Sequence, residues 1–120
     1  MTQPTTSYEF GDVVLVSFPF TNLKTTKKRP AVIISSSKYQ AYRPDLVLIA
    51  VTSQIRDPLS FGESFIADWQ QAGLIKPSVM KPLIATVERA IVLRRMGSLS
   101  ARDQLELKNS LRGILELDTK

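Results

Sequence analysis

The sequence predicts a small, mainly β protein: an antiparallel barrel of short strands with a short helical turn and a C-terminal helix. Two observations support this prediction. Short apolar and β-branched runs recur along the chain, each bounded by glycine, proline or polar residues. Helical periodicity over several turns occurs only near the C-terminus. A chain of 120 residues can form one domain with its own core, which we expect at residues 9–117 after a flexible leader at 1–8.

The first half of the chain predicts three strands. Residues 13–18 form a β-branched, apolar run after a glycine. Residues 31–35 follow Pro30, which has no N–H and therefore suits the first position of a strand. Residues 46–51 are apolar on both faces, which favours a central strand. The polar segments between and after these strands are predicted loops, at 19–28, 36–45 and 52–60.

The second half predicts shorter strands and the terminal helix. We expect strands at 63–67, 84–87 and 90–96, a helical turn at 68–72, and an interrupted segment at 77–82 that contains two prolines. The helix begins at Ser100, whose hydroxyl can cap the first turn, with Asp103 in the position of a capping-box acid. An apolar stripe follows, which predicts a core or dimer face: Leu107, Leu111, Ile114 and Leu115.

Composition excludes several kinds of chemistry. The chain has no cysteine and no histidine, so thiolate chemistry, His–metal sites and imidazole acid–base catalysis are excluded. We expect no metal and no cofactor. No apolar run reaches the length of a membrane span, and residues 1–7 lack a signal-peptide pattern, so we expect a cytoplasmic protein without a membrane partner. Of the net charge of +5, residues 1–56 carry +4 (seven basic against three acidic residues), a balance that attracts polyanions.

Two positions suit a phosphate-binding site. Arg29 precedes Pro30, which favours an extended backbone at Arg29, and Lys27 and Lys28 stand beside it. A guanidinium held by a rigid strand suits a phosphate. Thr52 follows the third predicted strand, so it meets Arg29 if the second and third strands are neighbours. The alternatives are a basic loop that merely starts a strand and a β-branched residue that merely ends one.

Short motifs in order along the chain resemble those of one toxin family. They are Gly11-Asp12-Val13-Val14 with Phe18, Arg29-Pro30-Ala31-Val32, Thr52-Ser53-Gln54, Trp69, Ala72-Gly73-Leu74, Thr86-Val87 and Gly97-Ser98-Leu99-Ser100. Over residues 8–116 the chain resembles the MazF/PemK toxins of bacterial type II toxin–antitoxin systems. The resemblance implies an SH3-like barrel, usually a homodimer. It also implies a metal-independent, sequence-specific endoribonuclease that cuts single-stranded RNA, often mRNA.

The resemblance also assigns roles to residues. The family's catalytic arginine and threonine fall on Arg29 and Thr52. Cleavage by the substrate's 2′-hydroxyl needs neither a protein nucleophile nor a metal. The implied protein partner is an antitoxin, through which alone the toxin would meet DNA. The residues expected to contact RNA are Thr21, Lys24, Lys27, Lys28, Ser53 and Gln54.

One departure leaves the acid–base assignment open. Some family members carry an aspartate, proposed as a general base, at a place that falls near Pro82, and no carboxylate lies between Asp68 and Glu88. The second hypothesis is therefore a catalytically silent barrel that binds nucleic acid or an antitoxin. A third is a gyrase-poisoning toxin of the same fold, which Arg29-Pro30 and Thr52 disfavour because that activity needs no phosphate-cleaving pair.

Overall fold

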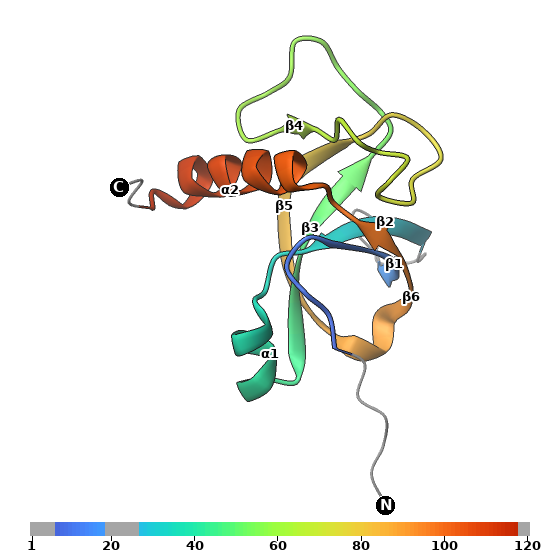
Figure 1. Ribbon diagram of the computed structural model, residues 1–120, viewed down its shortest axis with the longest axis vertical. Helices are drawn as coiled ribbons and strands as arrows, with labels where there is room; N and C mark the ends of the chain where they lie inside the picture. The colour runs from blue at the N-terminus through green and yellow to red at the C-terminus, as the bar shows by residue number, and fades with distance from the viewer. Residues whose placement is uncertain (1–6, 19–26, 118–120) are drawn as a thin grey trace, which may run out of the picture.

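The computed structural model describes residues 7–18 and 27–117, which form one antiparallel six-stranded sheet with a C-terminal helix (Figure 1). The strand order is β4-β5-β3-β2-β1-β6. The strands are β1 (Asp12–Phe18), β2 (Lys27–Ile33), β3 (Asp45–Thr52), β4 (Ser64–Phe65), β5 (Val79–Glu88) and β6 (Val92–Ser98). The helices are α1 (Ser37–Tyr42), the 3₁₀-helix η1 (Arg89–Ile91) and α2 (Ala101–Leu115).

The sheet is strongly curled. Strands β5 and β6 are four positions apart in the strand order, about 19 Å in a flat sheet, yet only η1 joins them. From Glu88 to Val92 the chain reaches at most about 14 Å, so the sheet bends round until these two ends meet (Figure 1). No ladder joins β5 to β6 within the described residues. The observed fold is therefore a curled antiparallel sheet, and barrel closure is not seen.

Alternating side chains of the central strands divide the core into two clusters. Val32 and Ile49 belong to the cluster under α2, where Leu107 and Leu111 of the helix also pack. Neighbouring strand residues form the second cluster, which consists of Tyr8, Val14, Val16, Ala31, Ile33, Leu46, Leu48 and Val87. Tyr8, assigned to the leader from the sequence, is thus part of this core. The prediction of a core-facing helix stripe is confirmed for Leu107 and Leu111, whereas Leu115 is 52% exposed.

Three element predictions need correction, and a fourth is confirmed. Strand β2 begins at Lys27, so Arg29 and Pro30 lie within it. Residues 37–42 form α1 instead of a loop, capped by the Ser36 hydroxyl, which accepts from the backbone N–H of Tyr39. Residues 79–88 form one strand, interrupted by a bulge. The expected single helical turn at 68–72 is confirmed, since the Ala72 N–H donates to the Asp68 carbonyl oxygen and Gly73 follows with a positive φ.

Candidate functional site

Arg29 and Thr52 lie across from each other on neighbouring strands. The β2–β3 ladder pairs Ala31 with Ala50, and extending this register by two residues sets Arg29 opposite Thr52. The regular ladder stops at Ala31 because Pro30 has no N–H to donate. Opposed residues in an antiparallel pair share a face, and both side chains line the same hollows. The prediction that the two strands are neighbours and bring these residues together is confirmed.

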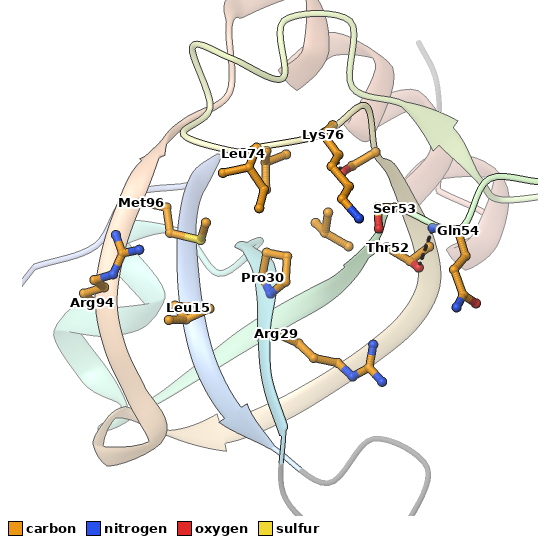
Figure 2. A pocket seen from close by; sticks show the side chains of 13 residues that line it. Leu15, Arg29, Pro30, Thr52, Ser53, Gln54, Leu74, Lys76, Arg94 and Met96 are labelled. Atoms are coloured by element: carbon orange, nitrogen blue, oxygen red, sulfur yellow. Dashed lines mark hydrogen bonds between the residues drawn. The ribbon is translucent and has the colours of Figure 1, made fainter.

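The main hollow beside this pair has a volume of about 410 Å³. Figure 2 shows Arg29 reaching toward the side of the hollow where Thr52 and Gln54 lie, with Lys76 and Arg94 on other parts of its wall. The apolar part of the wall consists of Leu15, Pro30, Val51, Leu74, Ile75 and Met96. The polar part consists of Arg29, Thr52, Ser53, Gln54, Lys76, Ser78 and Arg94.

Two smaller hollows adjoin the main one because they share Thr52 and Gln54 with it. The second hollow, about 270 Å³, is lined by Arg29, Ala50, Val51, Thr52, Gln54, Lys81 and Leu83. The polar hollow, about 110 Å³, is lined by Thr52, Gln54, Arg56, Ser60, Glu63 and Lys81. The three hollows therefore adjoin one another at Thr52 and Gln54, and we call the surface that they line together the groove.

The groove is electropositive. Its basic side chains come from separate parts of the chain: Arg29, Arg56, Lys76, Lys81 and Arg94. Within 7–18 and 27–117 none of them forms an ion pair. No acidic side chain lines the main or the second hollow, and Glu63 lines only the polar hollow. Uncompensated cations at the rim of a concave surface favour an anionic ligand.

Thr52 has a defined orientation. Its Oγ1 accepts a hydrogen bond of 3.1 Å from the backbone N–H of Gln54, so the hydroxyl is fixed while its own proton stays available to a ligand. Thr52 and Arg29 are both half-buried. A half-buried guanidinium loses less hydrogen-bond strength to water than a fully exposed one. The pair can therefore bind a phosphate by a charged two-point contact and one hydroxyl.

The other predicted contact residues divide into three groups. Ser53 and Gln54 line the main hollow as expected. Lys27 and Lys28 are exposed at the start of β2, opposite Phe18 and Ser17, and line none of the three hollows.

The third group, Thr21 and Lys24, lies outside the described residues.

Sequence reasoning missed four basic residues of the groove: Arg56, Lys76, Lys81 and Arg94. No motif marks them, because only the curl of the sheet brings them together.

The loop 66–78, which carries Leu74 and Lys76, is tied to the start of α2. The Asp103 carboxylate is buried and accepts hydrogen bonds of 2.8 Å from the backbone N–H groups of Ala67 and Asp68. Ser100 caps α2 as predicted by accepting from the Asp103 N–H. Asp103 thus anchors a loop, a role that the expected capping box did not include.

A second link joins the same two segments at the surface. The Arg102 guanidinium donates hydrogen bonds of 2.8 and 2.7 Å to the Asp68 carboxylate. This contact lowers the pKa of Asp68 to about 2. The loop also packs closely on β6: a Cβ added to Gly73, whose φ is +84°, would collide with the Met96 carbonyl oxygen. The wall of the main hollow is therefore held by α2 and β6.

Pro82, near which the sequence resemblance puts the aspartate of some family members, lies in a bulge of β5. Val51 pairs with Met80 and Ile49 pairs with Ile84, so Ala50 alone opposes residues 81–83. A bulge tolerates proline, which has no backbone N–H, because the ladder needs no donor at a bulged position. No carboxylate takes this place in the groove.

The described residues contain neither a metal-ligand cluster nor a membrane-spanning helix. In the described part of the chain no three His, Cys, Asp or Glu residues cluster as metal ligands. Across 7–18 and 27–117, no helix combines the length and apolar character that crossing a membrane requires.

Comparison with known proteins shows which family this chain belongs to. The model of the family "PemK-like, MazF-like toxin of type II toxin-antitoxin system" matches residues 9–115. No curated protein matches the chain. Solved structures do match. An endoribonuclease from Mycobacterial species has a TM-score of 0.76 at 14% identity, covering 98% of this chain and 100% of that one.

Two further structures are similar. MazE-MazF from Deinococcus radiodurans has a TM-score of 0.74 at 16% identity, covering 94% of this chain and 100% of that one. The Mycobacterium tuberculosis toxin MazF-mt6 has a TM-score of 0.70 at 18% identity, covering 89% and 98%. At these identities the likeness is one of fold. The family match spans nearly the whole chain and includes both Arg29 and Thr52, and the protein therefore belongs to the PemK-like, MazF-like toxins of type II toxin–antitoxin systems.

Proposed function

We propose that this toxin is a metal-independent, sequence-specific endoribonuclease that cleaves single-stranded RNA, including mRNA. The observation that supports this most is the opposition of Arg29 and Thr52 in a groove whose main hollow has no acidic lining. Similar structures described as endoribonucleases agree with the proposal. Unpaired bases of single-stranded RNA can be splayed into such a groove and contacted there by polar side chains.

The chemistry uses the substrate's own nucleophile. The 2′-hydroxyl gives its proton to water as the 2′-oxygen attacks the adjacent phosphorus. The bond to the 5′-oxygen of the next nucleotide breaks, and that 5′-oxygen takes up a proton from water. The products are a 2′,3′-cyclic phosphate and a 5′-hydroxyl. Arg29 holds the phosphate and stabilises the negative charge that develops on its oxygens. Thr52 positions the phosphate or the 2′-hydroxyl, and Ser53 and Gln54 bind the neighbouring nucleotide.

The family also suggests how the protein assembles. We propose that the curled sheet is an SH3-like barrel, that the toxin is a cytoplasmic homodimer, and that a cognate antitoxin neutralises it. Similar structures include an endoribonuclease in complex with its cognate antitoxin and MazE-MazF complexes. Two-fold dimers are the commonest oligomers. Light scattering at micromolar concentration tests the dimer, and a monomer that still cleaves RNA contradicts it.

A second candidate function is a catalytically silent module that binds nucleic acid or an antitoxin. Pro82 supports this candidate, because no carboxylate in the main or the second hollow can take the 2′-hydroxyl proton. Such a protein would still bind RNA through the basic groove, but it would not cleave.

Incubation of the purified protein with RNA in excess EDTA separates the two candidates. We expect cleavage by the wild type and a loss of roughly a hundredfold or more in Arg29→Ala, since a transition-state charge contact is removed. Lys38→Ala is the control, because Lys38 is exposed on α1 at the far end of β3 from Thr52. Binding without cleavage by the wild type would contradict the nuclease and favour the silent module.

A further inference from the structure

Lys81 lies where two of the three hollows adjoin. It lines both the second hollow, with Arg29 and Thr52, and the polar hollow, with Arg56 and Ser60. The groove therefore continues from the Arg29–Thr52 pair past Lys81 to a second group of polar side chains. The proposed function uses Arg29 and Thr52, and it assigns no role to Lys81 or Arg56.

The backbone around Lys81 is fixed by the bulge of β5. Residues 81–83 oppose Ala50 alone, so Lys81 and Leu83 both reach the second hollow. Pro82 packs against the loop before β4: a Cβ added to Gly62 would lie 3.1 Å from Pro82 Cβ. This contact holds the loop that carries Ser60 and Glu63 beside Lys81.

The polar hollow has the chemistry of a phosphodiester site. Its lining contains two cations, Arg56 and Lys81, against one acid, and no large apolar side chain. The acid, Glu63, accepts a hydrogen bond of 2.8 Å from the Ser60 N–H through Oε1. Within the described residues neither cation forms an ion pair. A base would need an apolar or stacking surface, which the main hollow has and the polar hollow lacks.

We propose that Lys81 and Arg56 form a second phosphate site, which holds the phosphodiester next to the one that Arg29 and Thr52 bind. The proposal rests on the proposed RNA-cleaving function. The polar hollow adjoins the Arg29–Thr52 hollow through Thr52, Gln54 and Lys81, so one extended strand can occupy both. Two phosphates held side by side fix the direction and register of the RNA across the groove.

The first experiment needs no knowledge of the cut site. Binding of a random-sequence single-stranded RNA decamer is measured against salt for the wild type, Lys81→Met, Arg56→Met and the control Lys38→Met. Each lost phosphate contact should lower the log–log salt slope by about 0.7. We expect this drop in Lys81→Met and Arg56→Met and no drop in Lys38→Met. Equal slopes for all four proteins, with unchanged thermal unfolding, would overturn the proposal.

The second experiment locates the phosphate. The probe is an RNA octamer that spans a mapped cut, with a 2′-deoxy sugar at the scissile nucleotide and one methylphosphonate at a time. On the 2′-deoxy octamer without a methylphosphonate, Lys81→Met should weaken binding roughly three- to tenfold. Neutralising the neighbouring phosphate should abolish that difference, whereas neutralising the scissile phosphate should abolish the effect of Arg29→Ala. An effect of Lys81→Met that is the same at every position would overturn the proposal.

The two proposals can fail separately. If the wild type cuts RNA and Lys81→Met behaves as Lys38→Met does, the second phosphate site is wrong and the nuclease stands. If the wild type cuts no RNA but the salt slope falls in both groove variants, the nuclease is wrong and the phosphate site stands.

Discussion

At the scale of single residues, Arg29 is defined by its place in β2. It is half-buried, faces Thr52 across the strand end, and has no acidic partner within the described residues. Since no acidic side chain in 7–18 or 27–117 pairs with it, its N–H donors can serve a ligand. A planar guanidinium can give a phosphate two parallel hydrogen bonds, which an ammonium cannot.

Arg29→Lys is therefore expected to lose most of its activity, although the charge is kept. The loss should be tenfold or more, because one point contact replaces the two-point contact to the transition state. The measurement is kcat/KM on an RNA with a mapped cut, alongside thermal unfolding. A Lys variant as active as the wild type would contradict the two-point contact.

Thr52→Val should lower turnover by roughly tenfold or more while leaving the fold intact. Valine keeps the β-branched shape that suits the strand end and removes only the hydroxyl. The Gln54 N–H that loses its acceptor is exposed, so water can replace the bond. Thr52→Ser is the matched control, since it keeps the hydroxyl and should keep most of the activity. Equal turnover in the Val and Ser variants would show that this oxygen has no role.

At the scale of elements, the site depends on how α2 holds the loop 66–78. Asp103, in the first turn of α2, accepts from two backbone N–H groups of the loop, and Arg102 adds a surface link to Asp68. The loop in turn brings Leu74 and Lys76 to the main hollow. Variants that destabilise this wall should therefore also weaken RNA binding.

Asp103→Asn should lower the free energy of unfolding by about 1–3 kcal/mol. Each carboxylate oxygen of Asp103 accepts from one backbone N–H of the loop. In asparagine an NH₂ group replaces one of these oxygens, so one backbone N–H loses its acceptor. Asp103 is buried, so water cannot replace the lost contact. Urea unfolding measures the change, and Glu106→Gln, on the exposed side of α2, is the matched control. Equal stability of the two variants would contradict the anchoring role.

The Asp68–Arg102 link should be sensitive to acid. The Arg102 contact holds the pKa of Asp68 at about 2, below the ordinary 3.8. A lowered pKa in the folded state stabilises the fold above about pH 4, and the contribution is lost as the pH falls from about 4 to about 2. In Arg102→Gln the pKa should return toward 3.8, as followed by an NMR titration of the Asp68 carboxyl carbon. A pKa that stays near 2 in this variant would contradict the assigned cause.

The elements that sequence reasoning found are those with strong periodicity. Strands β1 and β3 and helix α2 were predicted to within one or two residues. Helix α1 was missed because it is only six residues long and buries no side chain. Strand β5 was predicted as an interrupted segment at 77–82 followed by a separate strand at 84–87, because a proline such as Pro82 usually breaks a strand. Only the pairing with β3 shows that a bulge accommodates this proline.

At the scale of the whole molecule, the curl of the sheet assembles the groove. Residues from β1, β2, β3, β5, β6 and two loops line it, although they are far apart in the sequence. Arg29 and Thr52 were predictable because each stands in a recognisable motif next to an apolar run. Lys76, Lys81 and Arg94 were not, because each is an ordinary surface cation until the sheet bends. Their joint field, in a chain of net charge +5, favours RNA at long range.

The central claim is cleavage by the substrate's 2′-hydroxyl in this groove. The direct test compares an RNA that spans a mapped cut with the same RNA carrying one 2′-deoxy sugar at the scissile nucleotide, both in EDTA. The account predicts that the first is cut to a 2′,3′-cyclic phosphate and a 5′-hydroxyl, and that the second binds with similar affinity and stays intact. Cutting of the deoxy-substituted strand, or products with a 3′-hydroxyl and a 5′-phosphate, would contradict it.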